Sequence, residues 1–310
     1  MSLAVPRARR RLLCGALLAA ALAVPASAPA APFSPQSPWN APLASGAPLA
    51  PNSAALVADL TRQVAEHGAW INTTSYSTPI YKVAWNQPRV KVVLDRYSPP
   101  LQADFNAVPL PPDARPAAGW DRHLVVWQPH SDTMWEFWGL QKKADGWHTS
   151  WGAKLPQTSR HSGVLPAPFG ATASGLALAG GVMRPFELAE RNIPHALALG
   201  LPDVTAGAFT APATRTDGTL PGGGIPEGTR FRLPASLDVN ALGLQPAVKA
   251  MAIAAQRHGI LIRDVSGSVS FYAEDPTPTG SNPYPKLFGT GWMDHALARF
   301  PWDRLEVVAP

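Results

Sequence analysis

The chain has 310 residues, a formal net charge of +5 and one cysteine, Cys14. Its first 30 residues hold four arginines and no acidic residue, so the remainder carries a net charge of only about +1. That weak charge gives no support to nucleic-acid binding. Beyond residue 30 there is no cysteine, which excludes a disulfide and a thiol nucleophile there.

Residues 1–30 have the pattern of an export signal. Arginines at 7 and 9–11 form a charged segment, residues 12–24 form an apolar run, and small residues precede a cleavage site after Ala30. The apolar run is too short to span a bilayer, so no membrane span is expected. The sequence therefore predicts a secreted protein, extracellular or periplasmic.

The rest of the chain reads as a proline- and alanine-rich lead-in over residues 31–51 and one domain over residues 52–310. Thirty-five prolines and 25 glycines favour short strands and ordered loops over helices. We expect an all-β fold, a β-sandwich of jelly-roll (concanavalin-like) type with a few peripheral α-helices.

Periodicity and turn residues place the elements in chain order. Helices are expected over 53–67, 246–257 and 291–300. Strands outside the central stretch are expected over 80–85, 90–94, 193–199, 229–233, 260–265, 270–272 and 305–308. Between them, residues 211–224 form a long polar loop, and long loops in compact domains often border functional clefts.

The central stretch, Trp120–Trp151, holds six of the eleven tryptophans. It predicts a β-hairpin with a turn at 129–132, followed by a third strand. A four-residue turn places Val125 opposite Glu136, and His123 and Glu136 are then diagonal neighbours on one face. A turn with an odd number of residues would put them on opposite faces.

Glu136 is the first candidate for catalysis because it lies within an apolar run. A desolvated carboxyl group has a raised pKa, which suits proton transfer. Asp121 and His123 share its predicted face, as do Trp127 and Trp138, which would form a platform for sugar rings. The alternatives stay open: Glu136 as a solvating residue, the tryptophans as core, and Asp121 with Arg122 as a structural ion pair.

Further along the chain, Arg184, Glu187 and His195 complete the candidate set. Arg122 and Arg184 would bind an acidic sugar, whereas Glu187 or Asp121 would serve as a second carboxylate. His195, in an apolar strand, is either a catalyst or a hydrogen-bonded core histidine. Motifs of common serine hydrolases, zincins and nucleotide enzymes are absent, and no cofactor is expected. The histidines are scattered, so a metal site would need ligands from distant strands, and no metal is expected.

In the order and spacing of these residues, the chain resembles a family of exported, β-rich bacterial and fungal proteins. The shared features are Asp121-Arg122-His123, Glu136 on the next strand, Arg184 with Glu187, and His195-Ala196-Leu197. His258-Gly259 stands where the family has Tyr-Gly. The resemblance draws attention to Asp121, His123, Glu136, Glu187 and His195 without implying an activity.

Together these features favour a secreted enzyme that acts on a polysaccharide or oligosaccharide. The first hypothesis is a glycoside hydrolase that uses two carboxyl groups, with Glu136 as the acid. The second is a polysaccharide lyase that uses histidine and arginine on an acidic glycan. The third is a glycan-binding or cell-envelope protein without catalysis.

Overall fold

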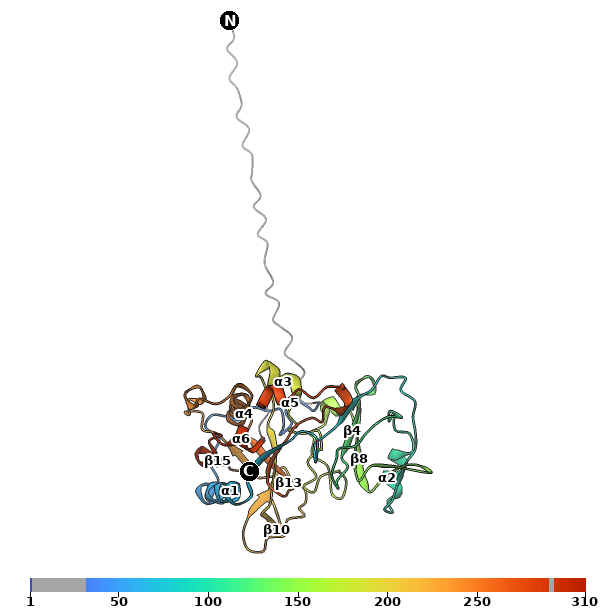
Figure 1. Cartoon of the computed structure of the whole chain (residues 1–310), viewed down its shortest axis with the longest axis horizontal. Coiled ribbons are helices and arrows are strands. Elements are labelled where there is room, and N and C mark those ends of the chain that lie inside the picture. Colours follow the sequence, from blue (N-terminus) through green and yellow to red (C-terminus); the bar gives the residue numbers. More distant parts are fainter. Residues whose placement is uncertain (2–31, 290–292) are drawn as a thin grey trace.

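The structure is a computed structural model that describes Met1, residues 32–289 and residues 293–310 (Figure 1). The predicted export signal lies outside the described residues apart from Met1. Within the described part of the chain, no helix is long and apolar enough to cross a membrane. The chain is rich in β-strand and forms several sheets with few helices, as the sequence predicts, and the jelly-roll type stays a prediction.

The largest sheet has six strands in the order β1-β14-β9-β13-β12-β15. It is mixed, because β1 pairs with β14, and β9 with β13, in parallel, whereas the other pairs are antiparallel. Its strands in chain order are β1 (Ala69–Asn72), β9 (Leu197–Leu201), β12 (Arg230–Arg232), β13 (Ile260–Val265), β14 (Val269–Tyr272) and β15 (Glu306–Val308).

The predicted hairpin lies in a second sheet of four strands, ordered β2-β4-β5-β8. Val125 pairs with Glu136, so the predicted register is confirmed. Its strands are β2 (Ile80–Lys82), β4 (Leu124–Gln128), β5 (Thr133–Trp138) and β8 (Trp151–Pro156). A third sheet contains β3 (Val92–Leu94), β6 (Gln141–Lys143) and β7 (Gly146–Thr149). A fourth sheet pairs β10 (Val204–Phe209) with β11 (Ile225–Glu227).

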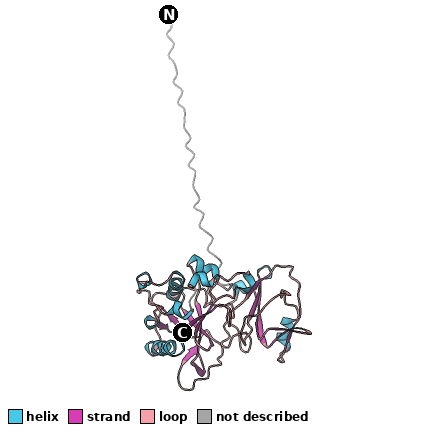
Figure 2. Ribbon diagram, viewed as in Figure 1, coloured by secondary structure: helices cyan, strands magenta, loops and turns pink. Residues whose placement is uncertain are grey.

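Helices gather mainly beside the six-stranded sheet (Figure 2). The predicted helices at 53–67 and 246–257 are confirmed as α1 and α4, because each has an apolar stripe and a glycine shortly after its end. The described helices are α1 (Ser53–His67), α2 (Pro99–Phe105), α3 (Pro185–Glu190), α4 (Pro246–Arg257), α5 (Tyr284–Phe288) and α6 (Met293–Leu297). The helix expected over 291–300 is shorter, and residues 290–292 lie outside the described residues.

The two larger sheets pack face to face. On β4 and β5, Val125 and Met134 join a core shared with Ala198 and Leu261 of the six-stranded sheet. Alternate residues on the same two strands point into a separate core with α2 and β7. The far face of the six-stranded sheet is covered by α1 and α4. Both faces of each large sheet are therefore buried.

One local prediction needs correction. The strand expected over 193–199 begins only at Leu197, so His195 lies in the segment before β9, because Pro194 cannot donate a backbone hydrogen bond there. The predicted lead-in over residues 31–51 contributes to the core, because Trp39 is fully buried and donates from Nε1 to the Gly163 carbonyl at 3.3 Å.

Trp39 packs against Gly181, which predicts a strong effect of a methyl group there. Gly181 has φ +68°, and a Cβ would lie 2.4 Å from the Ala198 nitrogen and 2.6 Å from the Trp39 ring. We expect Gly181→Ala to lower the free energy of unfolding by about 2–4 kcal/mol, measured by urea denaturation. Gly267→Ala is the matched control, because a Cβ there meets no atom within 4 Å. Equal stability of the two variants would contradict this packing.

Candidate functional site

A cleft opens beside the start of β4 and the end of β5, and its lining also includes the end of β13. It consists of two adjoining cavities of about 780 and 420 Å³. Asp121, His123, Asp264 and Val265 line both cavities. These four residues come from the segment before β4 and from the end of β13, so the cleft joins the two sheets.

Aromatic side chains form much of the cleft wall. In the larger cavity they are Tyr97, Trp138 and Trp151, and in the smaller cavity Trp70, Tyr76 and Tyr272. The guanidinium carbon of Arg96 lies 5.0 Å from the Trp138 ring centroid, which adds a cation to this wall. Flat apolar faces beside charged groups suit the alternating polar and apolar surfaces of a sugar chain.

His123 forms part of the cleft floor, and only 5% of it is exposed. Its Nε2 lies 3.2 Å from the Ala171 carbonyl oxygen. A carbonyl only accepts, so Nε2 carries the hydrogen and Nδ1 keeps its lone pair. Burial lowers the pKa of His123 to about 4, against the opposing effect of Asp121. The imidazole is therefore neutral at neutral pH.

Asp121 lies beside His123 and is partly exposed. It accepts a hydrogen bond from Trp138 Nε1 at 3.1 Å, which fixes the indole against the cleft wall. Arg122, the next residue, points elsewhere: it is exposed and donates to Gln141 Oε1 at 2.7 Å. Among the described residues, Asp121 and Arg122 do not form the structural ion pair that was considered as an alternative. The structure thus brings Asp121, His123 and Trp138 together and leaves Arg122 outside.

Glu136 lies on the predicted strand face, but that face packs against the six-stranded sheet. The residue is completely buried. Its Oε1 accepts from the Ala171 N–H and its Oε2 from the Leu178 N–H, both at 2.8 Å. Burial raises the pKa of Glu136, and the two backbone donors oppose the shift. The carboxylate thereby holds the segment that carries the Ala171 acceptor of His123.

Three other predicted residues form a cluster of their own, away from the cleft lining. Glu187 Oε2 accepts from the Arg184 backbone N–H at 2.8 Å and lies 3.1 Å from His195 Nε2. Glu187 and His195 are each 99% buried. The cluster joins α3 to the segment before β9, which agrees with the alternative of His195 as a hydrogen-bonded core histidine.

Trp127 also lies outside the cleft lining. The cations of Lys82 and Arg184 lie 5.4 and 5.6 Å from its ring centroid. Trp127 and Trp138 were expected on one platform because side chains alternate along a strand. They belong to opposite ends of the hairpin, however, and only the Trp138 end opens into the cleft.

Sequence reasoning missed the acidic side of the site. Asp217 and Asp264 line the larger cavity, and Glu227 lies next to them. Burial is the main cause that raises the pKa of Asp264 to about 7 and that of Glu227 to about 8. The polar loop over 211–224 was the available signal, because Asp217 lies in it. Nothing in the sequence placed Asp264 of β13 beside that loop.

Arg215 connects the same loop to the opposite part of the cleft wall. Its guanidinium donates to the backbone carbonyls of Phe169, Gly170 and Thr172, the last two at 3.3 and 2.5 Å. Three of its donors are therefore used within the protein, and Arg96 is the more exposed cation of the cleft lining.

Comparisons of the chain with protein-family models, curated proteins and solved structures found no match. Function must therefore be inferred from the geometry of the cleft.

Proposed function

We propose that the cleft binds an acidic polysaccharide and cleaves it by β-elimination, as a secreted polysaccharide lyase. The observation that carries this proposal is a neutral histidine in an aromatic cleft. His123 has a free Nδ1 lone pair as its acceptor, and its low pKa keeps it unprotonated at neutral pH. A positioned, unprotonated imidazole is a suitable group to remove a proton from carbon.

The reaction would proceed on a uronate residue. His123 takes the proton from C5, which is adjacent to the carboxylate, and the electron pair of that bond forms the C4–C5 double bond. The C4–O bond breaks, and the imidazolium returns the proton to the leaving oxygen. Asp121 stabilises the transient imidazolium through its negative charge, because its effect on the pKa of His123 is upward. Arg96 supplies a cation for the substrate carboxylate.

Hydrolysis is the second candidate, favoured by a different observation. Asp121 and Asp264 both line the two cavities, and a glycosidase needs a pair of carboxyl groups around the scissile bond. Glu136, the acid of the hydrolase hypothesis, gains no support from its sealed position between the sheets. A hydrolase would therefore have to use Asp121 and Asp264 instead.

One assay separates these reactions. The protein is incubated with polygalacturonate, alginate and hyaluronan, and with neutral glycans such as cellulose and xylan. Elimination is expected to give ultraviolet absorbance from an unsaturated uronate on at least one acidic substrate. New reducing ends without that absorbance would overturn the lyase in favour of the hydrolase. Retention of a glycan without any product would instead support the binding protein.

A further inference from the structure

Three carboxylates converge at the acidic side of the cleft. Asp217 comes from the loop between β10 and β11, Glu227 ends β11, and Asp264 lies on β13. One oxygen from each lies within 4.8 Å of the other two. Oxygen ligands of Ca²⁺ lie about 2.3–2.6 Å from the ion, so ligands on opposite sides of it are separated by about 4.6–5.2 Å. Three oxygens that lie within 4.8 Å of one another can therefore all contact one cation.

Glu227 is the observation that points to a ligand. Its side chain is completely buried, and neither of its carboxylate oxygens makes a hydrogen bond of ordinary geometry within the described residues. An ionised carboxylate that is buried without a partner costs several kcal/mol, so buried carboxylates are normally paired or bound to a metal. The Thr216 hydroxyl and the Asp217 backbone lie close enough to Glu227 to favour its charged form, but both groups are neutral and do not compensate its charge.

Nearby arginines fill this need only in part. Arg215 donates to three backbone carbonyls, and Arg263 Nη1 donates to the carbonyls of Leu178 and Gly180 at 2.7 and 3.0 Å. Their charges act on the carboxylates from nearby, Arg215 on all three and Arg263 on Asp264. Among the ion pairs of the described residues, however, none includes Asp217, Glu227 or Asp264.

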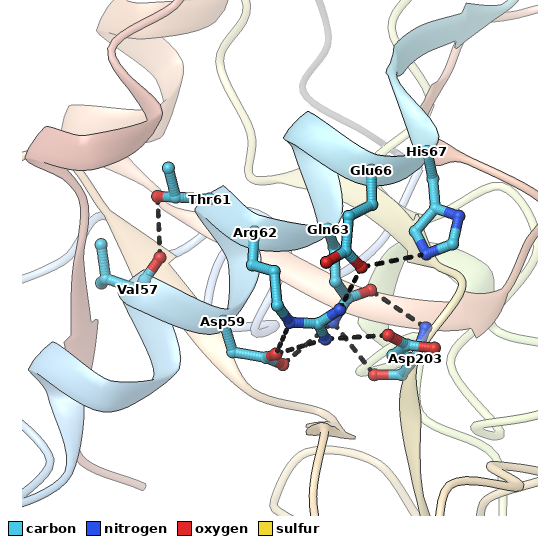
Figure 3. Close-up of polar contacts among 8 residues, drawn as sticks. All are labelled: Val57, Asp59, Thr61, Arg62, Gln63, Glu66, His67 and Asp203. Carbon is cyan, nitrogen blue, oxygen red and sulfur yellow. Dashed lines mark hydrogen bonds and ion pairs between the residues drawn. The ribbon is translucent and has the colours of Figure 1, made fainter.

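A second acidic cluster shows the contrast. Glu66, His67 and Asp203 also bring their ligand atoms within 4.8 Å of one another, but Arg62 lies among the acidic groups (Figure 3). Arg62 forms ion pairs with Asp203, Asp59 and Glu66 at 2.8, 2.6 and 2.5 Å. That cluster is exposed and already neutralised by a side chain of the protein, so it has no need of a metal ion.

We infer that Asp217, Glu227 and Asp264 bind a divalent cation, and that this cation is Ca²⁺. An all-oxygen ligand set suits hard cations. Three carboxylates on a loop and two strands fit the larger, more adaptable shell of Ca²⁺ better than the octahedron of Mg²⁺, which keeps several waters. Asp217 and Asp264 line the cleft, so an ion there is reachable from solvent and retains open positions for water or a ligand oxygen.

The cation would change the charge of the site. A divalent cation offsets two negative charges of the carboxylates, which weakens their repulsion of an acidic sugar, and it offers a coordination position to a carboxylate oxygen of that sugar. The binding itself is independent of the reaction, so it can be tested with no substrate. Failure of the lyase assay would leave the cation inference standing, and failure of cation binding would leave the assay interpretable.

The test measures calcium binding to the whole protein after treatment with a chelator. Titration calorimetry with calcium chloride is expected to show one site, and the melting temperature should rise with calcium concentration. Glu227→Gln should weaken calcium binding at least tenfold. Asp217→Asn should have the same effect, and because Asp217 is exposed, this substitution should not disturb folding. Glu66→Gln, in the neutralised cluster, is the matched control and should change the affinity by less than twofold.

Several outcomes would overturn the inference. The absence of a binding heat and of a thermal shift in the unmodified protein would remove the site. Equal affinity in Asp217→Asn and the unmodified protein would move the ion elsewhere. A response to magnesium chloride without one to calcium chloride would overturn the assignment of the ion.

Discussion

Replacing His123 with alanine is expected to lower kcat/KM on the cleaved polysaccharide at least about a hundredfold. A positioned general base contributes about 10²–10⁴ in rate, and His123 is the imidazole that lines the cleft. The measurement is the initial rate of ultraviolet absorbance at substrate concentrations well below KM. His123→Gln should be equally inactive, because an amide keeps a hydrogen-bonding group for the Ala171 carbonyl but cannot accept the proton.

His130→Ala is the control for this prediction. His130 is exposed in the turn between β4 and β5, where its ring lies 6.3 Å from that of Trp85. It should retain full activity. Since His123 is buried, the melting temperature of each variant must be measured as well. A folded His123→Ala protein that keeps more than a tenth of the activity would refute the role of His123 as base.

Arg263→Met is expected to cause the largest loss of stability, about 3–5 kcal/mol in the free energy of unfolding. Arg263 is completely buried between the two large sheets, with its guanidinium carbon 3.9 Å from the Tyr272 ring centroid. Its charge opposes the burial of Glu136 and Asp264, because it acts to lower the pKa of both. Methionine fills similar space but leaves these carboxylates uncompensated and the carbonyls of Leu178 and Gly180 without their donor.

Urea denaturation of Arg263→Met and Arg62→Met provides the comparison. Arg62 forms three ion pairs, whereas none of the described ion pairs includes Arg263. Arg62 lies at the surface, however, where ion pairs contribute little to stability. The loss should therefore be much smaller for Arg62→Met. Arg263→Lys should restore only part of the stability, since an ammonium group keeps the charge but cannot reproduce the contact of the guanidinium with the Tyr272 ring or its hydrogen-bonding geometry. Similar losses in Arg62→Met and Arg263→Met would show that burial of the charge is not the cause.

Local patterns in the sequence predicted the hairpin well. A turn of four residues fixed the pairing of Val125 with Glu136, and the alternation of side chains put Glu136 and Trp138 on one face. Helices α1 and α4 were likewise predictable, because their apolar residues recur with helical spacing and a glycine or proline marks an end.

Contacts between distant segments were not predictable from those patterns. Alternation shows that Glu136 faces one side of its sheet, but not that the six-stranded sheet covers that side. The partnership of Asp217, Glu227 and Asp264 depends on β11 and β13 meeting across the chain, which no local spacing encodes. The short helices α2 and α3 were not predicted either, because 7 and 6 residues are too few to show a helical repeat of apolar residues.

Arg215 has a consequence for how the cleft receives a ligand. One guanidinium fastens the irregular loop of Asp217 to the irregular wall around Phe169 and Thr172, so two segments without regular structure are held as a single unit. A rim built in this way has lost its conformational freedom before any ligand arrives, and less entropy remains to be lost on association. Affinity in this cleft would thus depend on a side chain that makes three hydrogen bonds to the protein backbone.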